Sequence, residues 1–256
     1  MRVKDCAAVV TGGSSGLGEA TVTRIVENGG KAAILDLSEE KGLALVEKLG
    51  NEHVLFVKTD VTSESDVQRA LEQTLGRFGQ IHAAVNCAGI GIAQKLLNKD
   101  KPHDLSTFTK VIQVNLVGTF NVIRLAAEKM IGNAPNENGE RGVIISTASV
   151  AAFEGQIGQV AYSASKGGIV GMTLPIAREL ARYGIRNVTI APGLFETPLF
   201  ASLPEEARTA LGAMVPFPPR LGQPDEYAML VQSIIENPML NGDTIRLDGA
   251  IRMQPK

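Results

Sequence analysis

Short apolar runs alternate with amphipathic segments along the whole chain of 256 residues. Apolar positions that recur every three or four residues predict helices, whereas short runs that are apolar throughout predict strands covered on both faces. Seven strands are expected, at Ala7–Thr11, Ala32–Leu37, Val54–Lys58, His82–Asn86, Gly142–Ser146, Arg186–Ala191 and Asp243–Leu247. This pattern predicts an α/β fold with a single domain over residues 1–256: a Rossmann-type, doubly wound, seven-stranded parallel sheet with helices on both faces.

Several helices have recognisable ends. The first is expected from about Gly16 to Glu27, and either Thr62 or Ser63 is placed to cap a later helix. Ser106 is expected to cap a long helix that continues to Met130. Pro224 opens the last helix, because proline is favoured in the first helical turn.

Two long stretches interrupt the alternation, and both follow the ends of predicted strands. Ala93–Asp104 is polar and lysine-rich, and Leu194–Leu221 is rich in Leu, Phe and Pro, with a short helix expected near Pro204–Met214. Open parallel sheets bind ligands outside the carboxyl ends of their strands. The stretch at about 194–221 is therefore the expected substrate loop.

Composition narrows the range of partners. The hydrophobic content of 44% is sufficient for a globular core, and the net charge of −2 gives no electrostatic footprint for nucleic acid. No run approaches the ~20 apolar residues of a membrane span, and the first strand begins too early to leave room for a leader. Cys6 and Cys87 lie in apolar contexts typical of reduced thiols, so a cytoplasmic location is expected. The three histidines show no metal-ligand spacing, and no metal is expected.

A glycine-rich turn, Thr11–Gly18, follows the first strand and opens the first helix. Gly12 permits a tight turn, Gly16 lets the backbone approach a pyrophosphate, and Gly18 allows close helix–strand packing. The N–H groups at the start of the helix are then available to phosphates. The turn predicts a dinucleotide site.

Asp36 ends the second strand, 18 residues after Gly18. An acid there accepts hydrogen bonds from adenosine ribose hydroxyls and repels a 2′-phosphate. No Arg or Lys occurs at the neighbouring positions that an NADP enzyme would use, namely Ser14, Ser15, Leu37 and Ser38. The expected cofactor is NAD, and the alternative is that Asp36 is a solvated turn residue.

Tyr162 and Lys166 are four positions apart, which places both side chains on one face of a helix. A free tyrosine titrates near about 10, too high for a base at neutral pH. An ammonium beside the phenol favours the phenolate, so Lys166 is expected to lower the pKa of Tyr162. Ser149 lies thirteen positions before the tyrosine.

Together these features resemble the short-chain dehydrogenase/reductase family over essentially the whole chain. The resemblance rests on the glycine turn, Asn86–Gly89, Asn115, Ser149, Tyr162 with Lys166, and Pro192-Gly193, all in the family's order. It implies a catalytic tetrad of Asn115, Ser149, Tyr162 and Lys166. Tyr162 would be the general acid/base and Ser149 would polarise the reacting oxygen. Lys166 would also bind the nicotinamide ribose, and Asn115 would hold a proton-relaying water.

The implied cofactor-binding residues include both segments that follow the third and fourth strands. They are Gly12, Ser15, Gly16, Leu17, Gly18, Asp36, Asp60, Val61, Asn86, Cys87, Ala88, Gly89, Tyr162, Lys166, Pro192, Gly193, Phe195 and Thr197.

Within the family, segments 149–156, 162–177, 191–195 and 245–255 resemble the branch that oxidises 3-hydroxyacyl-CoA thioesters. The implied substrate-binding residues are Ser149, Gln156, Gln159, Tyr162, Phe195, Leu199 and Phe200, with Leu203 beside them. The glutamines alternatively cap local turns, and the apolar loop alternatively lies in a subunit interface. The run Lys95–Lys101 either meets CoA phosphates or is a solvated loop. Glu196 departs from this branch, which carries a small residue there.

The leading interpretation is reversible NAD-dependent oxidation of a 3-hydroxyacyl-CoA to the 3-ketoacyl-CoA. The alternatives are a hydroxysteroid or other secondary-alcohol dehydrogenase, an acetoacetyl-CoA or 3-ketoacyl-carrier-protein reductase, and a cofactor-binding regulatory protein without catalysis. The family is typically tetrameric, and helices at Ser106–Met130 and about Ile157–Arg182 are expected to form a homotetramer interface, with Gly249–Pro255 as a further contact.

Overall fold

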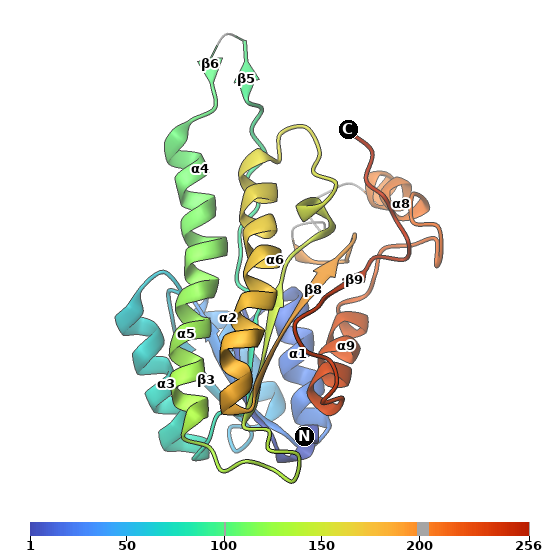
Figure 1. Ribbon diagram of the computed structural model, residues 1–256. Coiled ribbons are helices and arrows are strands. Elements are labelled where there is room, and N and C mark those ends of the chain that lie inside the picture. Colours follow the sequence, from blue (N-terminus) through green and yellow to red (C-terminus); the bar gives the residue numbers. More distant parts are fainter. Residues whose placement is uncertain (100, 199–204, 256) are drawn as a thin grey trace.

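In the computed structural model, which describes residues 1–99, 101–198 and 205–255, helices cover both faces of a seven-stranded parallel sheet (Figure 1). The strand order is β3-β2-β1-β4-β7-β8-β9, and every neighbouring pair is parallel. The strands are β1 (Ala7–Thr11), β2 (Lys31–Asp36), β3 (Val54–Lys58), β4 (Ala83–Asn86), β7 (Gly142–Thr147), β8 (Ile185–Pro192) and β9 (Thr244–Leu247). All seven predicted strands are confirmed, and their bounds shift by one residue at most.

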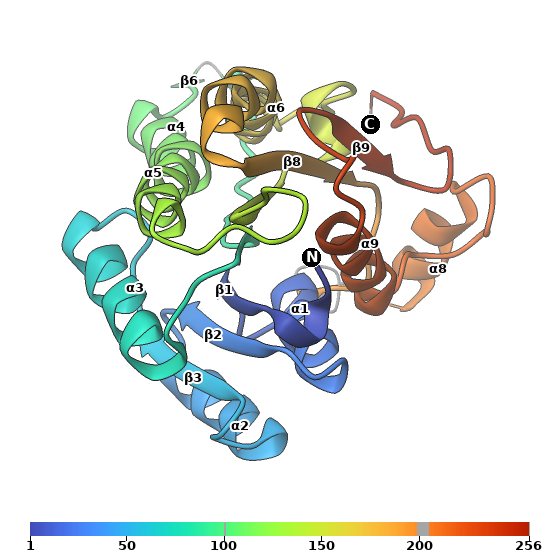
Figure 2. The same cartoon turned by 60° about the horizontal axis from the view of Figure 1, so that its bottom comes forward.

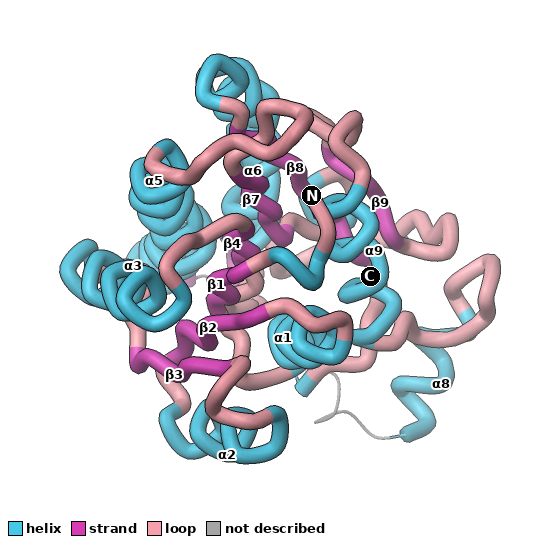
Figure 3. Tube along the Cα trace, turned by 90° about the horizontal axis from the view of Figure 1, so that it is seen from below, coloured by secondary structure: helices cyan, strands magenta, loops and turns pink. Residues whose placement is uncertain are grey.

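Two helical layers cover the sheet (Figure 2). One contains α1 (Gly16–Glu27), α2 (Glu39–Leu49) and α9 (Pro224–Glu236), and the other contains α3 (Glu64–Phe78), α5 (Gly118–Ile131) and α6 (Val160–Leu180). Successive strand residues face opposite layers: Ala8 and Val10 pack with the first layer, and Val9 packs with the second. Seen from below, the strands form one curved row between the helices (Figure 3). This two-sided burial explains why the strand sequences are apolar throughout.

The predicted helix ends are largely confirmed. Ser63 caps α3 by accepting a hydrogen bond from Asp66 N. Pro224 occupies the first turn of α9, where Gln223 and Glu226 form a capping box. Three short 3₁₀ turns lie at Val3–Asp5, Val150–Ala152 and Ala181–Tyr183.

The helix predicted from Ser106 to Met130 is interrupted and begins earlier. Asp104, not Ser106, is its cap, because the Asp104 carboxylate accepts the Ser106 N–H at 3.1 Å. The helix then consists of α4 (Leu105–Ile112), a π-helical stretch (η2, Gln113–Val117) and α5. A π-helical turn inside an α-helix often marks a functional site, and this one contains Asn115.

Both long connections contain regular structure. The stretch 93–104 forms a small antiparallel hairpin, β5 (Leu97–Asn98) and β6 (Lys101–Pro102), which projects beyond α4 (Figure 1). Such short pairing leaves almost no apolar pattern in the sequence, so it was not predicted. The helix expected near 204–214 is α8 (Glu205–Ala213). None of the described helices is long and apolar enough to cross a membrane.

A buried ion pair joins β8 to the segment before β7, and its arginine also binds the end of α9. The Arg186 guanidinium lies 2.6 Å from the Glu140 carboxylate, and both side chains are nearly inaccessible. The same guanidinium donates to three backbone oxygens, those of Ile234, Ile235 and Leu240, at or just after the end of α9. The charge is therefore fully hydrogen-bonded within the core.

We predict that Arg186→Met lowers the free energy of unfolding by about 3–5 kcal/mol, because it leaves the Glu140 carboxylate buried without its guanidinium. Urea denaturation measures this change. Arg178→Met, on an exposed position of α6, is the matched control and should change stability by less than about 0.5 kcal/mol. Equal stability of the two variants would contradict the prediction.

Candidate active site

The glycine turn packs too closely against its surroundings for larger residues. Gly12 has a φ of +62°, and a Cβ there would lie 2.8 Å from Ala88 N. A Cβ on Gly18 would overlap the Gly12 carbonyl. Gly16, at φ +53°, lies against Pro198 of the loop that follows β8. The roles inferred for Gly12 and Gly18 therefore have a direct steric basis.

Asp36 lies at the end of β2 and is tied to the glycine turn. Its carboxylate accepts the N–H groups of Ser14 at 3.1 Å and Ser38 at 2.9 Å. These two bonds fix the carboxylate while leaving it on the wall of a cavity of about 700 Å³. The glycine turn, including Ser15 and Leu17, lines the same cavity.

The far wall of this cavity comes from the ends of β3 and β4. Asp60 and Val61 line it, and Asp60 holds its own loop by accepting the Thr62 N–H at 2.9 Å. From the β4 side, Ala88 N donates to Thr11 Oγ1 at 3.2 Å. Gly89 brings the backbone close, since a Cβ there would lie 3.7 Å from Lys166 Nζ.

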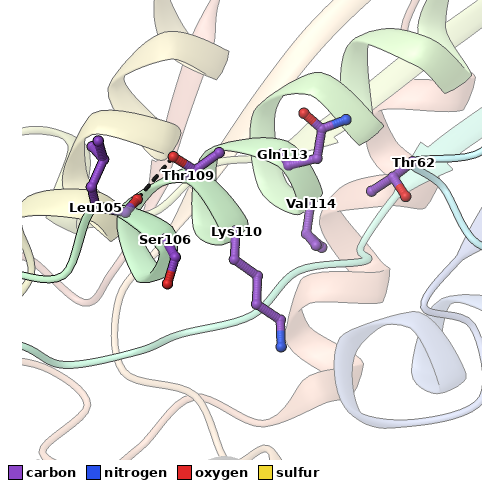
Figure 4. A pocket seen from close by; sticks show the side chains of 7 residues that line it. All are labelled: Thr62, Leu105, Ser106, Thr109, Lys110, Gln113 and Val114. Carbon is purple, nitrogen blue, oxygen red and sulfur yellow. Dashed lines mark hydrogen bonds between the residues drawn. The ribbon is translucent and has the colours of Figure 1, made fainter.

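An apolar hollow of about 650 Å³ adjoins this end of the cavity on the surface of α4. Thr62, Lys110 and Val114 line both spaces, and Figure 4 shows the Lys110 side chain extending away from its helix. The hollow contains none of the predicted acid/base residues. It is a neighbour of the nucleotide cavity rather than a reaction site.

The predicted reacting residues line a smaller cavity of about 150 Å³. Ser149, Tyr162 and Lys166 meet there, and Pro192, Gly193, Phe195 and Thr197 form its other side. Five residues are common to this cavity and the larger one, namely Leu17, Cys87, Gly89, Ile90 and Thr197. The two spaces thus form one cleft from Asp36 to Tyr162.

The pKa of Tyr162 is shifted in the direction opposite to the one that the sequence predicted. Burial raises the pKa of Tyr162 above its usual value, although a hydrogen bond with Ser149 acts in the opposite direction. Burial also lowers the pKa of Lys166 to about 8. The lysine ammonium donates to Thr147 O at 2.7 Å and lies 5.6 Å from the centre of the Tyr162 ring. In the free protein desolvation therefore outweighs the lowering of the Tyr162 pKa that the sequence predicted.

Asn115 is buried, and its side-chain amide is fully engaged. Its Oδ1 accepts the Ile90 N–H at 2.8 Å, and its Nδ2 donates to Ile90 O at 2.9 Å and to Ser165 Oγ at 3.1 Å. Ser165 Oγ in turn donates to Tyr162 O at 2.7 Å. Asn115 thereby joins the cofactor side of the cleft to the helix that carries the tyrosine. Both amide protons are therefore in use, and only Oδ1 retains a lone pair that can accept a hydrogen bond from a water.

Some of the predicted substrate-binding residues line the smaller cavity and others do not. Phe195 is buried and lines the smaller cavity. Gln159 Oε1 accepts the Gln156 N–H, and Gln156 Nε2 donates to Gln254 O, so both glutamines are engaged in local hydrogen bonds and neither lines the cavity. Leu199, Phe200 and Leu203 lie outside the described residues.

Glu196 faces away from the cleft. Its carboxylate accepts a hydrogen bond from Gln223 at 2.9 Å and one from Arg208 of α8 at 3.5 Å. The acid that departs from the family branch therefore contacts α8 and the start of α9.

The sequence interpretation missed the residues that support the site from behind. Thr147 holds Lys166, yet the predicted strand ended one residue earlier. Its position directly after a buried strand was the available signal, because strand ends of parallel sheets carry ligand-side residues. Ile90 was missed because its role is carried by its backbone. Among the described residues, no group of three or more His, Cys, Asp or Glu side chains is arranged to hold a metal ion.

Comparison with known proteins agrees with this geometry. A sequence model of the short chain dehydrogenase family matches residues 6–208. Human 3-hydroxyacyl-CoA dehydrogenase type-2 is 63% identical over 255 residues, which cover 99% of this chain and 97% of the human protein. The crystal structure of 3-hydroxyacyl-CoA dehydrogenase type-2 from Mycobacterium avium matches with a TM-score of 0.94 and 47% identity, covering 98% of this chain and 97% of that one.

A more distant structure has the same fold. The 3-ketoacyl-(acyl-carrier-protein) reductase from Brucella melitensis, complexed with NADH, matches with a TM-score of 0.85 and 28% identity, over 97% of this chain and 98% of that one. The chain therefore belongs to the short-chain dehydrogenase family.

Proposed function

We propose that this protein is an NAD-dependent oxidoreductase that interconverts 3-hydroxyacyl-CoA and 3-ketoacyl-CoA. The observation that carries the proposal is the continuous cleft, which has Asp36 and the glycine turn at one end and Ser149, Tyr162 and Lys166 at the other. The names of the human and mycobacterial relatives support this substrate class.

The residues of the larger cavity fit NAD. Asp36 would accept the adenosine ribose hydroxyls, the glycine turn would receive the pyrophosphate, and Lys166 would bind the nicotinamide ribose. When bound, NAD would supply the hydride-transfer chemistry in both the oxidation and the reduction direction. Gly89 lines both cavities, and a side chain there would come close to Asn115 and Lys166.

The proton is carried by Tyr162. In the oxidation direction the phenolate takes the proton of the 3-hydroxyl, and in the reduction direction the neutral phenol returns it to the carbonyl oxygen. Ser149 lines the same cavity as the phenol and would orient the reacting oxygen. Because burial raises the pKa of Tyr162, the neutral phenol predominates in the free protein at neutral pH. That form favours the reduction direction.

The acyl portion would pack on Phe195 and the loop that continues from it. A hydroxysteroid or another secondary alcohol fits the same chemistry, because the apolar wall is not specific for a thioester. A 3-ketoacyl-carrier-protein reductase shares the site as well. The ratio of kcat/KM for a 3-ketoacyl-CoA to that for a 17-ketosteroid separates the acyl-CoA and steroid possibilities, and a 3-ketoacyl-carrier-protein substrate added to the same comparison separates the third.

We further propose a homotetramer assembled through α5 and α6. Two stripes of exposed apolar side chains occur there at helical spacing: Val117, Phe120 and Ile131 near α5, and Val160 and Leu174 on α6. Gly167 and Gly171 continue the α6 stripe and have open space above them. Adjacent exposed apolar stripes are typical of subunit interfaces. A cytoplasmic location accords with the free thiols of Cys6 and Cys87.

Tyr162→Phe should lower kcat/KM by about 100-fold to 10,000-fold, because it removes the proton-transferring hydroxyl while keeping the ring. Steady-state assays with acetoacetyl-CoA, a medium-chain 3-ketoacyl-CoA and a 17-ketosteroid test both mechanism and substrate. Tyr183→Phe, at a tyrosine outside the cleft, is the control and should behave as wild type. A higher kcat/KM for the 17-ketosteroid than for the acyl-CoA substrates in the wild-type protein would reject the acyl-CoA assignment. A fully active Tyr162→Phe variant would reject the mechanism.

Asp36→Ala should narrow the preference for NADH over NADPH by about 10-fold to 100-fold, since it removes a charge-assisted hydrogen bond and a repulsive charge. The ratio of kcat/KM for the two cofactors measures this. Glu39→Ala removes an exposed carboxylate three positions later, on α2, and should leave the ratio near its wild-type value. A wild-type protein that prefers NADPH would show that Asp36 has a different role.

Phe120→Lys should reduce the assembly mass measured by sedimentation, because it places a charge in the proposed interface. Met239→Lys places the same charge at an apolar and more exposed position elsewhere on the surface, and it should leave the assembly mass unchanged. Identical masses for both variants would place the interface outside α5.

A further inference from the structure

Behind the cleft lies a buried hydroxyl pair that the proposed mechanism does not use. Tyr227, on α9, is completely inaccessible, and its OH lies 2.7 Å from Thr147 Oγ1. Thr147 Oγ1 also lies 2.6 Å from Asn86 O. A carbonyl oxygen only accepts, so the single Thr147 hydroxyl proton is directed to Asn86. Tyr227 must therefore be the donor to Thr147.

The same assignment sets the direction of the hydrogen bond between Cys87 and Tyr227. Cys87 Sγ lies 3.7 Å from the Tyr227 OH, and the thiol is placed to donate to it. The hydrogen bonds then run in one direction, from the Cys87 thiol to Tyr227, to Thr147 and to the carbonyl of Asn86. Because Asn86 and Cys87 are consecutive, the phenol and Thr147 together hold the start of the segment that lines the cofactor cavity.

Thr147 is also the residue that receives the catalytic lysine. Its carbonyl oxygen accepts from Lys166 Nζ at 2.7 Å, and the following peptide N–H, of Ala148, donates to Ile190 O at 2.8 Å. The peptide is thus fixed from β8, and the side chain of the same residue is fixed from α9 and β4. A threonine held on every side presents its carbonyl in one direction.

The surroundings of Lys166 make that carbonyl important. Lys166 is buried, with only 5% of the residue exposed. The titratable groups facing it are Tyr162 on its own helix, Cys87 from the β4 side and Tyr227 from α9 behind Thr147. None is a carboxylate, and burial raises the pKa of each of these three groups. The lysine charge therefore depends on a neutral dipole rather than on an anion.

We propose that Tyr227 is a positioning residue that acts through Thr147 to hold the Lys166 ammonium in its catalytic place. The consequence rests on the proposed function, because it concerns the lysine of that site. Without the phenol hydroxyl, the Thr147 carbonyl is less firmly oriented, and the ammonium form of Lys166 is less favoured. The pKa of Lys166, already lowered to about 8 by burial, would fall further.

Tyr227→Phe tests the inference with an isosteric ring. In turnover, kcat should fall about threefold to tenfold with KM for the acyl-CoA unchanged, and the alkaline limb of the kcat profile should move to lower pH by about half a unit. A structural role alone would not move the pH profile of correctly folded enzyme. Tyr183→Phe is the matched control.

A second readout needs neither cofactor nor substrate. Competitive acetylation of the free protein over a range of pH, followed by peptide mass spectrometry, gives the titration midpoint of Lys166. It should be lower in Tyr227→Phe than in the wild type and unchanged in Tyr183→Phe. If the wild type fails to turn over acyl-CoA, the proposed function fails, while this titration still decides the inference.

Substitutions at Thr147 show whether the effect passes through that residue. Thr147→Ser keeps the hydroxyl and should keep the Lys166 titration midpoint near that of the wild type, whereas Thr147→Val removes it and should reproduce the shift seen in Tyr227→Phe. The double variant Tyr227→Phe/Thr147→Val should then cost no more than Thr147→Val alone. Additive losses, or an unchanged Lys166 midpoint in Tyr227→Phe, would overturn the proposal.

Discussion

The site depends on one constraint: parallel strands of a single sheet end at the same edge. Thr11, Asp36, Asn86 and Thr147 end β1, β2, β4 and β7, and each makes contacts at the cleft. Their backbones are held by the sheet hydrogen bonds, which bring the terminal side chains and carbonyls to one edge, and side-chain hydrogen bonds then orient them. The glycine turn then fits against Ala88 because no side chain intervenes.

Desolvation sets the electrical character of the reacting residues. Burial disfavours both the Lys166 ammonium and the Tyr162 phenolate, raising the pKa of the tyrosine and lowering that of the lysine. A pair in which both charged forms are disfavoured is poised for proton transfer in either direction when a bound molecule changes the local field. The carbonyl of Thr147 and the hydroxyl of Ser149 provide the dipoles that counter this cost.

The walls of the cleft come from parts of the chain with very different amounts of support. The strand ends at Thr11, Asn86 and Thr147 are buried. Asn115 in the π-helical stretch is buried as well, and its side chain is hydrogen-bonded to Ile90 and Ser165. The hairpin beyond α4 is joined to the rest by few contacts, including the bond from Gln94 N to Gly158 O at 2.9 Å. Glu196 links the loop after β8 to α8 and α9 through exposed polar contacts, whose individual energies are small. The proposed acid/base residues thus lie in the buried part, whereas the loop after β8 is linked to α8 and α9 by exposed polar contacts.

The sequence by itself determined the strands, most helix ends, the glycine turn, Asp36 and the spacing of Ser149, Tyr162 and Lys166. These features follow from local rules: apolar runs, capping residues and helical periodicity act over a few neighbouring positions. Tertiary structure alone decided the break around Asn115, whereas the cap at Asp104 is itself local, because its carboxylate accepts the N–H of Ser106 two positions later. Tertiary structure also brought Thr147 to Lys166 and brought Asn86 and Tyr227 to Thr147, because these residues are far apart in the chain. The direction of the Tyr162 pKa was likewise beyond local reasoning, since desolvation depends on everything that packs around a group and not on its neighbours in sequence.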